Sequence, residues 1–156
     1  MQEINIEHFE LGLSSTSPAD MAKLAGSNFP IAGRVPEAAG EAFDWHAWYR
    51  AWMKQAGKAD AEVTSPTHLI AQAADTFEAS IPWEQLDYAA VLYRLDGEPL
   101  KKTGPIRLYV PNGSSKCLNV KSIVKIKIEN HAASEQAEAT YGFKHTFSAD
   151  ELRKNR

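Results

Sequence analysis

The sequence has only one cysteine, Cys117, so it cannot form an internal disulfide bond. A lone thiol fits a reducing compartment, and we therefore expect a cytoplasmic protein. The N-terminal stretch MQEINIEHFELGL lacks both the basic and the apolar segment of a secretory signal. No apolar run approaches the roughly 18 residues that a membrane-spanning helix needs, so we expect no association with a membrane.

An excess of basic residues is also lacking. The chain carries 17 Lys and Arg against 20 Asp and Glu, a formal net charge of −3. A surface that follows the phosphates of a nucleic acid normally has a basic excess, so we expect no nucleic-acid partner. The hydrophobic content of 44% is that of a globular protein rather than a disordered one, and 156 residues fit one domain with a single core.

Catalytic motifs are missing as well. The sequence contains no G-x-S-x-G, no H-E-x-x-H and no P-loop, so hydrolase, metalloprotease and NTPase functions have no motif support. No histidine has a second histidine or a cysteine at the spacing of zinc ligands, which favours core or solvated histidines. The five histidines are His8, His46, His68, His131 and His145.

The clearest predicted element is a helix that begins after Asp44 and ends before Gly57. Five large apolar side chains recur at helical spacing and share one face, and they are Trp45, Trp48, Tyr49, Trp52 and Met53. A cofactor-stacking platform is one interpretation of this stripe, but burial in the core is the interpretation we adopt, because each aromatic ring removes a large apolar area from water. We expect His46, off the stripe, at the surface.

The remaining pattern predicts short strands interspersed with short helices, which favours an α+β fold with a mixed sheet. Asp96-Gly97 predicts a type I′ hairpin, Ser17 is expected to cap a helix, and Ser80 is a second candidate cap. The predicted strands are residues 4–13 with a bulge, 29–35, 61–63, 68–71, 74–81, 88–95, 106–110 and 123–128. The predicted short helices are 18–24 and 83–86, with residues 14–17 as a turn.

Residues 1–130 are expected to form the domain, and residues 131–156 a polar C-terminal tail. The stretch from His131 to Thr140 is rich in alanine and glutamate and loses the periodicity of the preceding strands. Ser148 and Glu151 have the spacing of a capping box, which predicts a short final helix.

The stretch from Gly104 to Ile128 contains the most informative loop. Pro111 and Asn112-Gly113 end its first strand, and a polar segment then precedes the second. Hydroxyls, an amide and two cations suit a phosphate or an oxygen-rich ring, although a solvated surface loop has the same composition. The side chains concerned are Ser114, Ser115, Lys116, Asn119 and Lys121.

Three motifs in this region resemble the molybdopterin-binding domain of the sulfite oxidase family. They are LDGEPL at 95–100, GPIRLYVP at 104–111 and NVKSIVKI at 119–126. In that family the molybdenum is held by a pterin dithiolene and by a cysteine upstream of the helix. Here residues 1–43 contain no cysteine, residues 31–36 read IAGRVP, and Ser122 replaces the tryptophan of the V-K-W motif.

The resemblance therefore implies a degenerate molybdopterin-binding domain with a sulfite-oxidase-type fold and without the usual turnover. It implies that a pterin, the molybdenum cofactor or another small anion is held by Arg34, Ser115, Lys116, Cys117, Asn119 and Lys121. We expect Lys121→Ala to weaken a bound phosphate by roughly ten- to a hundredfold.

Two alternatives stay open. In the first, the chain is an active molybdenum-dependent oxidoreductase in which Cys117 replaces the lost metal ligand, with Lys116 and Lys121 favouring its thiolate form. Against this stands a small, inert and partly buried cysteine. In the second, the scaffold is a non-catalytic module that presents a surface to a protein partner of unknown kind.

Overall fold

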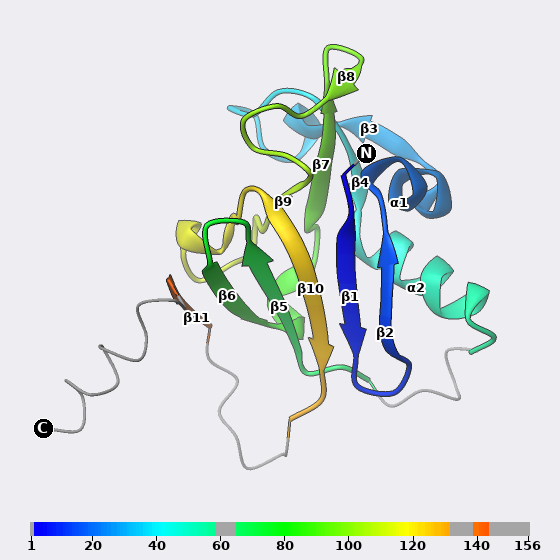
Figure 1. Cartoon of the computed structure of the whole chain (residues 1–156). Helices are drawn as coiled ribbons and strands as arrows, with labels where there is room; N and C mark the ends of the chain where they lie inside the picture. Colours follow the sequence, from blue (N-terminus) through cyan, green and yellow to red (C-terminus); the bar gives the residue numbers. More distant parts are fainter. Residues whose placement is uncertain (1, 59–64, 132–138, 144–156) are drawn as a thin grey trace, which may run out of the picture.

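The computed structural model describes residues 2–58, 65–131 and 139–143, in which eleven strands form two sheets accompanied by two α-helices (Figure 1). The first sheet contains β1 (Ile4–His8), β2 (Gly12–Thr16), β5 (His68–Ala73), β6 (Phe77–Pro82), β10 (Ile123–Glu129) and β11 (Thr140–Phe143). The second contains β3 (Asn28–Pro30), β4 (Glu41–Asp44), β7 (Ala90–Leu95), β8 (Glu98–Pro99) and β9 (Arg107–Tyr109). The helices are α1 (Pro18–Ala25), α2 (Trp45–Gln55) and the 3-10 helices η1 (Ile31–Gly33), η3 (Trp83–Leu86) and η4 (Lys116–Leu118).

The first sheet has the order β11-β6-β5-β10-β1-β2, and Figure 1 shows β10 between β5 and β1. Only the β1–β10 pair is parallel. The predicted single strand over residues 4–13 is wrong, and so is the predicted turn over 14–17, because β1 and β2 form a hairpin. The turn is closed by Nδ1 of His8, which accepts hydrogen bonds from the amides of Glu10 and Leu11, and by Gly12 at a φ of 78°.

The second sheet has the order β3-β4-β7-β8. Strand β9 also pairs with β7, at residues 90–92, whereas β8 pairs with β7 at residues 94–95. The predicted type I′ hairpin joins β7 to β8, since Asp96 and Gly97 both have positive φ, at 54° and 79°. Gly40, which directly precedes β4, lies close to Leu92 and Arg94 of β7. Its carbonyl accepts a hydrogen bond from the amide of Ile31. This bond closes the segment between β3 and β4.

The predicted aromatic helix is confirmed. Oδ2 of Asp44 accepts a hydrogen bond of 2.8 Å from the amide of Ala47 and so caps α2. The helix packs its stripe into the main core, where Trp45 and Trp48 are at most 1% exposed. The interpretation of the stripe as core is therefore also confirmed. Helix α1 begins as predicted, with the amide of Asp20 donating to Oγ of Ser17.

A second, smaller apolar cluster covers the other side of the second sheet. Its buried members come from η1, the two central strands, β9 and the residue after β8, and they are Ile31, Ala42, Ala90, Leu92, Leu100 and Tyr109. Strands β4 and β7 therefore contribute side chains to both clusters. Ile31 belongs to this cluster, and Val35 and Ala38 pack against it. This packing fixes the segment that carries Arg34, which donates a hydrogen bond to the Ala89 carbonyl.

Several predicted boundaries differ from the structure. Residues 29–35 form β3 and then η1 rather than one strand, and a turn at 74–76 separates β5 from β6. Pro82, not Ser80, precedes η3, and no side chain caps that helix. His46 is half-buried rather than at the surface, with 23% of its side chain exposed, because it packs edge-on against Trp83.

The expected α+β class is confirmed, and the first sheet is mixed as expected because β1 and β10 run parallel, whereas the second sheet is antiparallel throughout. Strand β11 pairs with β6, so part of the stretch predicted as a tail extends the first sheet. The predicted strand at 61–63 and the predicted helix near Ser148 lie outside the described residues. No helix in the part of the chain that the structure describes is long and apolar enough to cross a membrane.

Candidate functional site

The loop between β9 and β10 passes from one sheet to the other. The sequence predicts both strands correctly, but they do not pair as a hairpin, since β9 belongs to the second sheet and β10 to the first. A single bridge, Ile106 to Ile123, and a 2.8 Å hydrogen bond from the Leu108 amide to the Val120 carbonyl hold the two ends together. Leu118 and Val120 are buried and anchor the loop in the main core.

Two polar side chains of this loop accept hydrogen bonds from backbone amides and so stabilise the loop conformation. Oγ of Ser115 accepts a hydrogen bond of 3.1 Å from the Cys117 amide and caps η4. Oδ1 of Asn119 accepts one of 2.7 Å from the Val110 amide. With these acceptors engaged, the Ser115 hydroxyl proton and the Asn119 amide group remain as hydrogen-bond donors for a ligand.

These donors line a cavity of about 400 Å³, which we call the donor cavity. Residues 34–37 form one wall, and residues of the 110–119 loop form the other. Four of the six predicted site residues meet here: Arg34, Ser115, Lys116 and Asn119. Sequence reasoning missed Glu37, which lines the same cavity, because nothing in its polar surroundings distinguishes it from a solvated surface acid.

Arg34 is held rigidly at the edge of the donor cavity. Its Nη1 lies 2.6 Å from Oδ1 of Asp44 and donates to the carbonyls of Tyr88 and Ala89, while its guanidinium carbon lies 4.4 Å above the Phe29 ring. Burial raises the pKa of Asp44, but the bonds from Arg34 and the Ala47 amide outweigh it and hold that pKa below its usual value. Asp44 therefore compensates much of the Arg34 charge.

Lys116 is the main uncompensated cation of the donor cavity. Its side chain is exposed, and no ion pair joins it to an acid among the described residues. The cavity therefore offers one exposed ammonium group, a guanidinium whose charge is partly neutralised, and neutral donors on the loop.

The carbonyl of Tyr88 reaches Arg34 through an unusual backbone conformation. Tyr88 has a φ of 65°, which is rare for a bulky residue, and the residue is 66% exposed. We expect Tyr88→Gly to raise the free energy of unfolding by about 0.5 kcal/mol, since glycine adopts this φ readily but loses more entropy on folding. Tyr88→Val should instead lower it by about 1 kcal/mol. Urea unfolding of both variants measures the difference, and equal destabilisation by both would contradict backbone strain.

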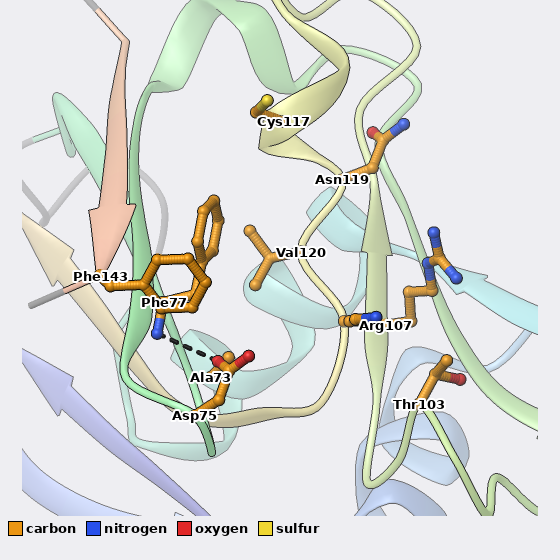
Figure 2. Close-up of a pocket in the computed structure, with 10 residues that line it drawn as sticks. Ala73, Asp75, Phe77, Thr103, Arg107, Cys117, Asn119, Val120 and Phe143 are labelled. Carbon is orange, nitrogen blue, oxygen red and sulfur yellow. Dashed lines mark hydrogen bonds between the residues drawn. The ribbon is translucent and has the colours of Figure 1, made fainter.

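A second cavity of about 360 Å³ lies on the other side of the loop, and we call it the phenyl cavity (Figure 2). Figure 2 shows Phe77 and Phe143 on one side, Val120 facing them and Cys117 above. The amide of Phe77 donates to Oδ1 of Asp75 at its base. This cavity is mainly apolar where the rings lie.

The remaining predicted residues, Cys117 and Lys121, line the phenyl cavity, and Asn119 lines both cavities. Five of the six predicted residues thus lie in this loop and Arg34 lines a cavity beside it, but the six do not form one site. The expectation of a partly buried Cys117 is wrong, because the thiol is exposed on η4. Across residues 2–58, 65–131 and 139–143, no group of three or more His, Cys, Asp or Glu side chains is placed to hold a metal ion.

Arg107 is a further lining residue of the phenyl cavity that sequence reasoning missed. Its Nε is buried and has no hydrogen-bond partner among the described residues, and its guanidinium carbon lies 4.9 Å from the Tyr109 ring centroid. A cation within a strand of otherwise buried residues was the signal that could have identified it.

No family model matches the chain, and comparison with curated proteins gives no match. The resemblance to molybdopterin-binding domains therefore depends on the three sequence motifs alone. The donor cavity fits the phosphate of such a cofactor, because it combines an ammonium, a guanidinium and neutral donors. It does not fit the metal end, since the only cysteine lines the other cavity.

Proposed function

We propose that this protein binds a small anionic ligand in the donor cavity and does not carry out sulfite-oxidase-type turnover. The observation that supports the proposal is the arrangement of Ser115 and Asn119, whose acceptors hold the loop while their donors remain for a ligand. A wall rich in donors beside Lys116 favours ligands that carry negative charge or several oxygen atoms.

Each residue has a distinct part in the proposed binding. Lys116 supplies charge, while the amide of Asn119 and the hydroxyl of Ser115 supply fixed directions, because the hydrogen bonds to Val110 and Cys117 restrict both side chains. Arg34 is oriented in advance by Asp44, so ligand binding does not require it to lose further freedom. The scaffold remains that of a degenerate molybdopterin-binding domain in this proposal.

Lys116→Ala is expected to weaken the binding of inorganic phosphate by about tenfold. A hydrogen bond to a charged group contributes about 1.5–3 kcal/mol, and the exposure of Lys116 places its contribution at the lower end. Isothermal titration calorimetry of the full chain with inorganic phosphate measures the loss. Lys121→Ala is the matched control, because it removes the same charge from the phenyl cavity and should leave affinity nearly unchanged.

The control also revises the expectation from sequence, in which Lys121 holds the anion. If Lys121→Ala weakens binding and Lys116→Ala does not, the ligand occupies the phenyl cavity and the proposed site is wrong. Equal small losses in both variants indicate only the general effect of net charge.

The cofactor itself is tested separately from the anion. Protein produced in a host that makes molybdopterin is assayed for molybdenum by elemental mass spectrometry and for pterin by fluorescence after oxidation. Near-stoichiometric molybdenum that disappears in Cys117→Ala would favour the alternative oxidoreductase and overturn the proposed loss of turnover. Pterin without metal would show that the protein binds a pterin, and loss of that pterin in Lys116→Ala would place it in the donor cavity.

A further inference from the structure

The donor cavity carries charges of both signs that do not neutralise each other. Glu37 and Lys116 both line it, yet no ion pair joins them, and neither pairs with any other described residue. The acid of the Arg34 pair is Asp44, which lies outside the cavity lining. Glu37 therefore remains as a carboxylate that faces a cavity otherwise rich in donors.

Apolar residues line the donor cavity beside the charged ones. Val35 and Pro36 lie between Arg34 and Glu37 in the chain, and Val110 and Pro111 begin the opposite wall. Proline and valine offer no donor to a ligand and suit methylene groups. The lining thus combines three kinds of group: hydrogen-bond donors with Lys116, apolar side chains and the Glu37 carboxylate.

A purely anionic ligand uses Lys116 and the neutral donors but is repelled by the exposed Glu37 carboxylate. A ligand with an anionic group and an ammonium group has a partner for both charged residues. A cavity of about 400 Å³ also limits such a ligand to a small molecule.

We infer that the ligand of the donor cavity is a short aliphatic zwitterion, with a phosphate or carboxylate at the Lys116 end and an ammonium group at Glu37. This inference depends on the proposed function, because it specifies which small anion the same cavity binds. Glu37 is then the residue that determines specificity, and Lys116 the residue that provides general attraction for anions.

The test compares two ligands of similar size that differ in one charge. O-phosphoethanolamine carries an ammonium group, whereas ethyl phosphate ends in a methyl group. Wild-type protein is expected to bind O-phosphoethanolamine about fivefold more tightly, the effect of one partly exposed ion pair. Glu37→Gln is expected to remove this preference and to leave the affinity for ethyl phosphate equal or slightly higher.

Glu98→Gln is the matched control, since it makes the same change of net charge on an exposed residue of β8 that does not line the donor cavity. It should retain the fivefold preference. Equal wild-type affinity for the two ligands, or a preference that survives in Glu37→Gln, overturns the inference while phosphate binding still supports the proposed function. Failure of inorganic phosphate, ethyl phosphate and O-phosphoethanolamine to bind at all overturns the proposed function itself.

Discussion

Replacing Gly40 with alanine is expected to lower the free energy of unfolding by about 3 kcal/mol. An ideal Cβ at this position would lie 2.6 Å from the Arg94 carbonyl oxygen and 2.6 Å from Cδ1 of Leu92, so strand β7 would have to move. Gly40 also has a φ of 123°, which residues with a side chain rarely adopt. Overpacking and the unfavourable φ each cost about 1–3 kcal/mol.

The same substitution should weaken binding of inorganic phosphate. Gly40 closes the segment that carries Arg34 and Glu37 to the donor cavity, because its carbonyl accepts the hydrogen bond from Ile31. Gly33→Ala is the control in the same segment, since a Cβ there meets no atom within 4 Å. Urea unfolding should show a change below about 0.5 kcal/mol for Gly33→Ala, and a comparable loss in both variants would contradict the close approach at Gly40.

His8→Asn is expected to cost about 2 kcal/mol at pH 8. Nε2 of His8 lies 2.9 Å from the Tyr49 hydroxyl, and Nδ1 accepts hydrogen bonds from the Glu10 and Leu11 amides. These amide bonds require an unprotonated Nδ1, so Nε2 carries the proton and donates to Tyr49. Asparagine leaves the Tyr49 hydroxyl without this buried partner, and its smaller side chain leaves a gap.

The cost should shrink as the pH falls. Burial lowers the pKa of His8 despite the nearby Glu10 carboxylate. Below about pH 6.5, the unfolded chain therefore binds a proton at His8 that the folded chain does not, and the contribution of His8 to wild-type stability declines by at most about 1.4 kcal/mol per pH unit. The decline begins as the pH drops through the unfolded pKa and ends below the folded pKa.

Urea unfolding between pH 5 and pH 8 measures this dependence. Burial also lowers the pKa of His46, although Asp44 and Asp87 oppose it, so the wild-type profile contains both residues. His8→Asn should flatten only its own part of the profile, and His46→Asn only the other. An unchanged slope in His8→Asn would mean that His8 is protonated in the folded protein and that its tautomer has been assigned wrongly.

Local patterns predicted the helices and the α+β class well. Helix α2 was predictable because its cap and its apolar spacing agree, and the β7–β8 hairpin because Asp96-Gly97 favours positive φ. The β1–β2 hairpin was missed because its turn, Phe9 to Leu11, contains two apolar residues. A histidine side chain, rather than a typical turn residue, closes it.

The candidate site was predictable in composition but not in arrangement. The loop residues were recognised by their polar side chains, yet sequence could not show that η4 directs Lys116 and Cys117 to different cavities. Glu37 shares the donor cavity with a loop that is distant in the chain, and no local pattern encodes that proximity. Tertiary packing therefore decided which of the predicted residues share a cavity.

The loop from β9 to β10 connects two separate hydrogen-bonded ladders. Each end is fixed to a different sheet, so the loop keeps its shape only while the sheets are docked against each other. A ligand in the donor cavity should therefore stabilise the arrangement in which the two sheets pack against each other. It should slow hydrogen exchange in both sheets, not only in the residues it contacts. Ligand binding at a surface cavity would in this way increase the stability of the buried strands.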